Sequence, residues 1–340
     1  TLRDLFASIN LQADEVIFGR DYEASLSVLH NVQNYENSTT MGRPGMNKKI
    51  VNSYLMADGS RFTDKAGYET MTFDQECQNR DPRLAQTIRT PGYTRIGSTK
   101  KEAPNLAYTM TGYHLIKYSM TANYDEYNKS CNDIPLFRTA EVYLNFAEAK
   151  AELGTLKQAD INKSIKLLRD RVGMTNLDME LANSKPDPYL MSAATGYPNV
   201  KGANQGVILE IRRERTIELA MEGFRYYDIM RWKEGKLFEN DLLGIYVPGP
   251  GTYDLDKDGT DDVCFYVGTK PAGNVPLYLE IGEQIRLSNG ESGYIICHSL
   301  ITKKWNEDRD YLYPVPISER TLSNGVITQN PGWNDGLNFN

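Results

Sequence analysis

Apolar and charged residues recur with helical spacing between residues 207 and 232. The apolar row follows the i, i+3, i+4, i+7 pattern of a side that faces a core, and it consists of Ile217, Ala220, Met221 and Phe224. A second row carries charges of both signs at intervals of three or four residues: Arg215, Glu218, Glu222, Arg225, Asp228 and Arg231. Together the two rows predict one long helix over residues 207–235, bent at Gly223 and stopped at Gly235, because glycine weakens a helix interior and favours a helix end.

Two interpretations of the charged row stay open. A buried helix needs its charges paired, because an unpaired buried ion costs several kcal/mol. A solvated face would instead carry ordinary i, i+4 pairs, each worth about 0.2–0.5 kcal/mol.

A second helical pattern covers residues 138–173. Its first half is an amphipathic helix ended by Gly154, with an apolar face made by Ala140, Tyr143, Leu144, Ala147 and Ala151. Its second half ends at Gly173 and has the apolar positions Ile161, Ile165, Leu168 and Val172. The two helices resemble one tetratricopeptide unit, which cannot bury its own stacking faces, so we expect other helices to pack on it.

The rest of the chain lacks long helical periodicity. Residues 90–133 and 175–205 are loop-like, whereas short alternating runs at 263–268 and 293–300 predict strands. Prolines at 314, 316 and 331 predict an extended tail without regular helix, held by Tyr311, Tyr313 and Trp333. The expected fold is mainly α, with tetratricopeptide-like helix pairs, a loop-rich C-terminal portion and a few short strands.

Composition argues against several classes of function and site. A net charge of −7 over 340 residues leaves no basic stripe for nucleic acid. Without a run of 18 apolar residues, no membrane-spanning helix is expected. The cysteines lack the CxxC spacing of a zinc site, and we expect free thiols or at most one disulfide among Cys77, Cys131, Cys264 and Cys297.

Catalytic motifs are also lacking. The sequence has no G-x-S-x-G, no H-E-x-x-H and no phosphate-binding glycine loop. His30, His114 and His298 are far apart, so each is expected to be structural. We therefore expect no enzyme, although the abundant carboxylates leave a glycosidase pair open.

An acidic stretch, YDLDKDGTDD (253–262), is the clearest candidate for metal chemistry. Alternating carboxylates, a glycine for the turn and a backbone carbonyl suit Ca²⁺, and the candidate ligands are Asp254, Asp256, Asp258, Thr260 and Asp262. Phe265 stands where an EF-hand has its bidentate glutamate. A Ca²⁺ site and a solvated acidic turn are both open interpretations.

Tyrosine is unusually frequent, with 22 residues, and many lie in the polar segment 93–127. An aromatic ring can cover the apolar face of a sugar or pack on a peptide side chain while its hydroxyl stays hydrogen-bonded. Most tyrosines are expected at the edge of the core. The candidate ligand contacts, chosen for their loop setting, are Tyr93, Tyr108, Tyr113 and Tyr253.

Four stretches in order resemble one family. VNSYLMADG with NRDPRL, the helix pair FRTAEVYLNFAEAKAELG and INKSIKLLRDRVGM, the helix IRRERTIELAMEGFRYYDIMRW, and YLYPVPISE with QNPGW are similar to the SusD/RagB family. These are outer-membrane nutrient-binding lipoproteins of Bacteroidetes. On this resemblance residues 1–340 form a SusD/RagB-like domain that lacks the family's N-terminal helical part, and 207–235 is its signature helix.

The resemblance implies a non-catalytic role. It implies capture of oligosaccharides at the cell surface for uptake through a TonB-dependent, SusC-like barrel transporter. It also implies lipid anchoring to the outer membrane through an N-terminal region absent from this sequence. The alternatives are a peptide-capturing member of the same family, a glycan-degrading hydrolase and a helical-repeat adaptor that binds only protein.

Overall fold

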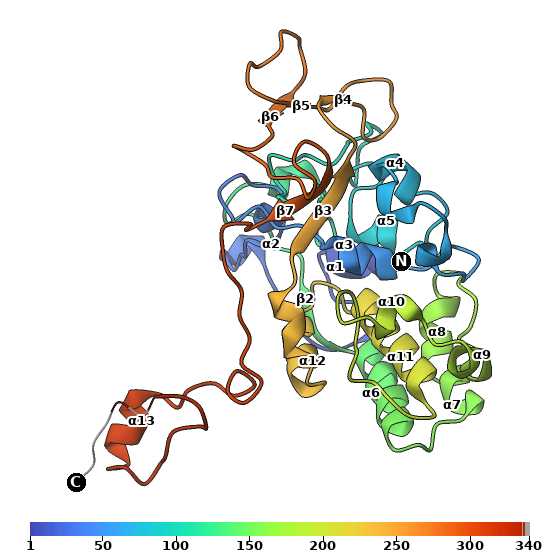
Figure 1. Cartoon of the computed structure of the whole chain (residues 1–340), viewed down its shortest axis with the longest axis vertical. Coiled ribbons are helices and arrows are strands. Elements are labelled where there is room, and N and C mark those ends of the chain that lie inside the picture. The colour runs from blue at the N-terminus through green and yellow to red at the C-terminus, as the bar shows by residue number, and fades with distance from the viewer. Residues whose placement is uncertain (335, 337–340) are drawn as a thin grey trace.

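The computed structural model describes residues 1–334 and 336 and contains a helical part, a set of small sheets and an extended C-terminal segment (Figure 1). The helical part holds α6 (Thr139–Glu152), α7 (Gln158–Asn162), α8 (Ile165–Asp170), α9 (Met179–Ser184), α10 (Pro188–Met191), α11 (Gln205–Glu218) and α12 (Arg225–Arg231). Shorter helices precede it: α1 (Leu2–Ala7), α2 (Val32–Glu36), α3 (Lys48–Ser53), α4 (Phe73–Glu76) and α5 (Leu84–Thr87). No helix in the described residues is both long and apolar enough to cross a bilayer.

Helix α11 is buried along almost its whole length. Every residue from Gly206 to Glu218 is buried. Gly206 allows a close approach to α9, because a Cβ there would lie 1.8 Å from the carbonyl oxygen of Ala182. The first part of α11 packs in a helical core with α6, and its end packs in a second core with the sheets through Ile217. The helix therefore joins the two cores.

The prediction of one helix over 207–235 is wrong. The helix ends at Glu218, and α12 begins only at Arg225. Met221 (φ 65°) and Gly223 (φ 86°) both adopt left-handed backbone conformations, which no α-helix can continue through. Gly235 does not stop α12, which ends at Arg231, but begins a 3₁₀ turn, η5 (Gly235–Glu239).

The helix pair expected at 138–173 has an unbroken first helix and a divided second one. Helix α6 ends before Gly154, and the segment after α8 ends at Gly173; both glycines have positive φ. Between α7 and α8 the backbone departs from helical geometry at Ser164, whose φ and ψ are −134° and −92°. Its hydroxyl donates to the Asp160 carbonyl at 2.7 Å, a local bond of the kind that competes with regular helix.

The strands of the described residues form three small sheets. Strands β1 (Val16–Arg20) and β2 (Ile134–Arg138) are antiparallel, as are β3 (Leu242–Val247) and β7 (Gly293–Cys297). In the third sheet β5 (Val263–Tyr266) lies between antiparallel β4 (Gly251–Tyr253) and parallel β6 (Leu277–Glu280). Strands β5 and β7 fall in the two runs predicted as strands. All four cysteines are free thiols.

The C-terminal segment leaves the body in an extended path and carries α13 (Ile317–Leu322) at its far end (Figure 1). The prediction that this tail has no regular helix is wrong. Helix α13 starts directly after Pro316, so that residue's missing N–H costs no intrahelical bond. Tyr311 holds the part of the tail that is nearer the body of the molecule, because its hydroxyl accepts from the Gly235 amide at 2.9 Å.

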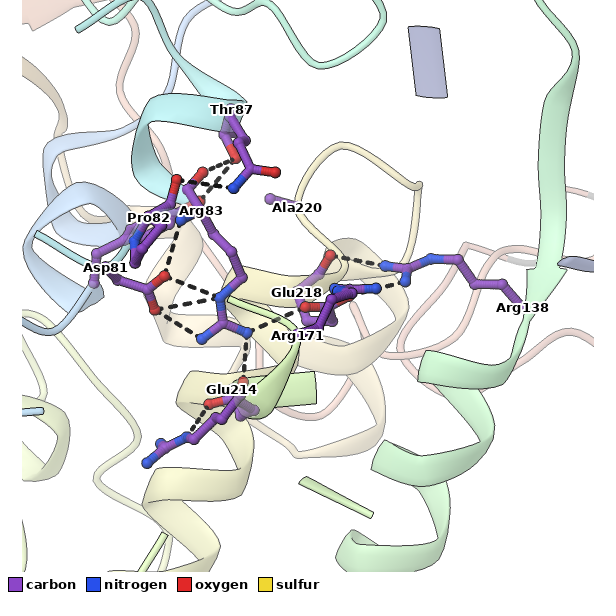
Figure 2. Close-up of polar contacts among 12 residues, drawn as sticks. Asp81, Pro82, Arg83, Thr87, Arg138, Arg171, Glu214, Glu218 and Ala220 are labelled. Carbon is purple, nitrogen blue, oxygen red and sulfur yellow. Dashed lines mark hydrogen bonds and ion pairs between the residues drawn. The ribbon is translucent and has the colours of Figure 1, made fainter. Parts of the chain in front are cut away.

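An ion network fixes the middle of the molecule (Figure 2). Arg83, on the 81–83 turn before α5, donates to Asp81 at 2.7 Å and also to the α11 carboxylates Glu214 and Glu218. Glu218 also accepts from Arg138 at 2.8 Å and from Arg171. Burial disfavours the carboxylate, but the guanidinium groups outweigh it and hold the pKa of Glu218 below its usual value.

The charged row therefore has no single environment. Arg215 is buried and pairs with Asp228 at 2.7 Å, and Asp228 also pairs with half-exposed Arg231. Glu218 and Glu222 pair with side chains of other segments, not with each other or with their helical neighbours. The buried interpretation thus holds for most of the row, with partners that come mainly from elsewhere in the chain.

Candidate functional site

The acidic loop, residues 254–262, connects β4 to β5 in an antiparallel hairpin. The hairpin is closed at its base by the Asp262 amide, which donates to the Tyr253 carbonyl at 2.9 Å. Lys257 (φ 59°) and Gly259 (φ 91°) have left-handed backbones that turn the chain sharply. The sequence D-x-D-x-D-G thus produces a tight loop in which Asp254 and Asp256 are part-buried or buried and Asp258 is exposed.

Those carboxylates organise the loop by accepting backbone amides. Asp254 accepts from Lys257 at 2.7 Å and from Gly259 at 2.9 Å. Asp262 accepts from the Leu255 amide at 2.7 Å, which ties the two ends of the loop together. Asp258 accepts from the Thr260 amide at 2.8 Å.

Three of the five predicted metal ligands converge. One oxygen from each of Asp254, Asp256 and Asp262 lies within 4.8 Å of the others. Asp258 and Thr260 are exposed and lie outside this group. The donor set fits a hard cation such as Ca²⁺, which takes carboxylate oxygens in flexible geometry and needs six to eight of them, so water or ligand oxygens would have to complete the shell.

Burial and repulsion from neighbouring carboxylates raise the pKa of two of these carboxyls, those of Asp256 and Asp262. The pKa of Asp262 rises to about 6, chiefly through burial and then through the charges of Asp256 and Asp254. The pKa of Asp256 is raised by the same causes, burial first and Asp258 next. A divalent cation among these groups would remove the repulsion.

A cavity of about 310 Å³ lies beside the loop, and we call it the Tyr253 cavity. Its floor is apolar and is made by Phe73, Ile245, Val247, Leu255 and Phe265. Its polar lining comes from three segments and consists of Thr72, Asp74, Gln75, Tyr246, Tyr253, Asp254 and Lys257. The Tyr253 hydroxyl donates to the Gly249 carbonyl at 2.7 Å, so the ring is held in a fixed position.

A second cavity, of about 450 Å³, uses other residues of the same loop. Asp256, Asp258 and Asp262 line it together with Lys100 and Lys101. The acidic loop therefore contributes to two neighbouring hollows.

The other candidate tyrosines do not line the Tyr253 cavity. Tyr113 is fully buried and donates its hydroxyl to Glu76 at 2.7 Å, which corrects the expectation of an accessible ring. Tyr93 is also buried, with the guanidinium groups of Arg3 and Arg89 at 4.9 and 5.3 Å from its ring centre. Tyr108 is half-buried with its ring edge against His114. Burial, which a loop setting in sequence does not reveal, separates these tyrosines.

Sequence reasoning missed Tyr246, Asp74 and Gln75 of the Tyr253 cavity. Tyr246 lies on β3, where it pairs with Tyr294 of β7, so its side of the strand is set by sheet pairing. Asp74 and Gln75 belong to the four-residue helix α4, far away in sequence. No local motif marks these three residues.

Two of the three histidines, His30 and His114, are structural. The ring of His30 is hydrogen-bonded to the Asn132 carbonyl at 2.9 Å, and that of His114 to the Glu36 carbonyl at 3.0 Å. Burial lowers the pKa of both rings. Each prefers the neutral form that its buried position requires.

Comparison with solved structures shows which known proteins share this fold. A SusD-like protein from Bacteroides fragilis has a TM-score of 0.60 at 21% identity, covering 98% of this chain and 57% of that one. A SusD-like carbohydrate-binding protein from Bacteroides fragilis has a TM-score of 0.57 at 21% identity, covering 95% of this chain and 56% of that one. The chain thus spans just over half the length of these structures, which share its helix-rich fold.

Comparison with curated protein sequences gives no match. The sequence model of the SusD family, in contrast, matches residues 14–333, which is nearly the whole chain. The match includes the helix pair, α11 and α12, the acidic loop and most of the tail. The chain belongs to the SusD family.

Proposed function

We propose that this chain captures oligosaccharides at the surface of the outer membrane without transforming them and passes them to a TonB-dependent, SusC-like barrel transporter. The membership of the SusD family carries the proposal. One relative of the same fold is described as carbohydrate-binding.

The Tyr253 cavity is the proposed contact for the glycan. A sugar has an apolar face and a rim of hydroxyl groups, and this cavity offers two half-exposed tyrosines above an apolar floor. Asp74, Gln75 and Lys257 add hydrogen-bonding groups at its side. Concave sites of this composition are typical of small-molecule binding.

Ca²⁺ bound by Asp254, Asp256 and Asp262 is the proposed cofactor. Asp254 belongs both to this group and to the lining of the Tyr253 cavity. The ion would hold the loop that forms one side of the glycan contact. It would act in binding and not in catalysis.

Isothermal titration of oligosaccharides into the purified chain tests the proposal. Tyr253→Ala should weaken binding about tenfold, the loss of one aromatic contact with its area. Tyr127→Ala is the matched control, because that tyrosine is 71% exposed and does not line the cavity. Equal affinities for the two variants would refute the Tyr253 contact.

Two further results would favour one of the alternative functions instead. Release of shorter products from the same oligosaccharides by the purified chain would favour a hydrolase. Saturable binding of peptides with no binding of glycans would favour the peptide-capturing alternative. Co-purification of a barrel transporter from outer membranes tests the partner and the location.

A further inference from the structure

A cavity of about 410 Å³ lies at the end of β7 and shares no residue with the Tyr253 cavity; we call it the β7 cavity. It is formed by the segments 283–286 and 295–301 together with Arg43 and Met110. Its volume falls in the range of about 300–1,000 Å³ that is usual for small-molecule sites. Figure 1 shows that the C-terminal segment leaves the body directly after β7, so the cavity lies at the base of that segment.

The apolar part of the β7 cavity is aliphatic. It includes Met110, Ile285, Ile295, Cys297, Leu300 and Ile301. Leu300 is 81% exposed and Ile301 is 59% exposed, so both present apolar surface to solvent. None of the described residues that line the cavity is Phe, Tyr or Trp, so the cavity offers no such ring for the apolar face of a sugar. An aliphatic surface of this kind gains free energy by covering an aliphatic ligand group.

Two guanidinium groups supply positive charge to the same cavity. Arg43 donates through Nη2 to the Leu106 carbonyl at 2.5 Å, which holds its side chain in place. Its Nη1 has no partner among the described residues and, unlike Nε, is not sealed from solvent, so it stays open to an acceptor from a ligand. Arg286 is exposed, and its guanidinium has no ion pair in the part of the chain that the structure describes. Glu283 is the single carboxylate in the lining, so two guanidinium groups leave a net positive charge.

The backbone is strained at two residues of the lining. Arg43 (φ 50°) and His298 (φ 56°) both adopt the left-handed conformation, which is uncommon for residues other than glycine. Arg43 also stands directly before Pro44, a position that favours extended backbone. Its carbonyl accepts from the Met110 amide at 3.0 Å, so another residue of the lining helps to hold this conformation. Strained backbone of this kind gathers at ligand sites, where the surrounding structure maintains it.

We propose that the β7 cavity binds an aliphatic carboxylate. The carboxylate lies at Arg43 and Arg286, and the aliphatic group packs on Ile285 and Leu300. Arginine pairs with carboxylates through parallel N–H donors, and such charge-assisted bonds are about twice as strong as neutral ones. A peptide that ends in an aliphatic residue and a free fatty acid both carry this chemistry. The site goes beyond the proposed function and does not depend on it.

Isothermal titration with matched probes tests this chemistry on the full chain. The probes are octanoate and N-acetyl-alanyl-leucine, each compared with its neutral amide. At least one acid should bind saturably, and its amide should bind at least about tenfold more weakly, because the charge-assisted bond is lost. Binding of only one of the two acids supports the site and identifies the source of the carboxylate. Equal affinities for acid and amide, or binding of glucuronate with neither acid bound, would overturn the proposal, as would no binding at all.

Substitutions locate the bound carboxylate. Arg43→Gln should weaken the affinity for the acid about tenfold. Arg286→Gln should weaken it by a smaller factor, because that side chain is exposed and its charge is screened. Arg20→Gln is the matched control, because Arg20 is exposed and does not line the cavity. Unchanged affinity in a folded Arg43→Gln variant would overturn the site; if that variant does not fold, unchanged affinity in Arg286→Gln would do so.

A second pair of substitutions tests the aliphatic contact. Leu300→Ser should weaken the affinity for the acid, whereas Leu153→Ser should not, because Leu153 is similarly exposed but lies outside the cavity. Equal affinities for the two variants would contradict the contact at Leu300.

Failure of this site and failure of the proposed function are distinguishable. Arg43→Gln should leave the affinity for oligosaccharides unchanged, and Tyr253→Ala should leave the affinity for the acid unchanged. Each titration therefore reports on one site.

Discussion

Glu218→Gln tests whether the buried ion network holds the fold together. Glu218 is fully buried and accepts hydrogen bonds from Arg83, Arg138 and Arg171, which come from three separate segments. Glutamine has nearly the same shape but no negative charge, and its amide nitrogen can only donate, so it faces a guanidinium group that also donates. The change therefore removes the charge and one acceptor while leaving the packing intact.

The expected cost is about 3–5 kcal/mol, the loss found when one partner of a buried ion pair is removed. The lower end is expected, because each arginine keeps another carboxylate: Arg83 keeps Asp81, and Arg138 and Arg171 keep Glu15. Set against a total stability of about 5–15 kcal/mol, this loss is large.

Urea unfolding followed by tryptophan fluorescence measures the effect. The control is Asp170→Asn, which breaks the exposed Lys166–Asp170 pair, where both side chains are at least 40% exposed. That change should cost less than about 1 kcal/mol. The structural role of the network would be refuted if the Glu218→Gln variant were at least as stable as Asp170→Asn, with the dependence of the free energy of unfolding on urea concentration unchanged in both variants.

The pH dependence supplies a second readout. The arginines hold the pKa of Glu218 below the ordinary value of 4.5. Its contribution to stability is therefore fully present above pH 4.5 and is lost as the pH falls through the lowered pKa of the folded state. The difference between wild type and Glu218→Gln should be greatest at neutral pH and should narrow in acid.

Three other predictions concern separate regions. Burial raises the pKa of Glu36 to about 7, so ionisation of this carboxyl lowers the free energy of unfolding as the pH rises from 4.5 to 7. In urea unfolding, Glu36→Gln should therefore stabilise the chain by up to about 3 kcal/mol at pH 8 and by little at pH 4. Gly112→Ala should destabilise by more than about 1 kcal/mol in the same assay, because φ is +82° and the added Cβ would meet Ile245 at 2.8 Å. Calorimetric titration of Ca²⁺ into chelator-treated chain should give saturable heat that Asp256→Asn abolishes, and a flat trace for the wild type would reject the metal site.

The sequence was most informative where local pattern alone decides the structure. Helix α6 and the glycine ends of the helix pair followed from apolar spacing, and strands β5 and β7 followed from alternation. The break after α11 did not, because Met221 in a left-handed conformation contradicts its own helical preference. Tertiary packing overrides local preference at that position.

The candidate site was predictable only in part. The acidic loop is continuous in sequence, so its spacing predicted a shared site for five residues, of which Asp254, Asp256 and Asp262 meet and Asp258 and Thr260 do not. The Tyr253 cavity needs α4 beside β3, a juxtaposition that no local pattern encodes. Tyr113 shows the converse, because a polar-looking segment hides a fully buried ring.

Helix α11 explains how one buried network can stabilise both cores of the molecule. Its end contributes Ile217 to the core that also contains Phe73 and Phe265, two residues of the floor of the Tyr253 cavity. Its earlier turns belong to the helical core, and Glu214 binds Arg169 of α8. Weakening the network should therefore lower the stability of both cores together, whereas substitutions in the Tyr253 cavity should change only the affinity for the ligand. A Glu218→Gln variant that lost oligosaccharide affinity while fully folded would contradict this separation between frame and binding surface.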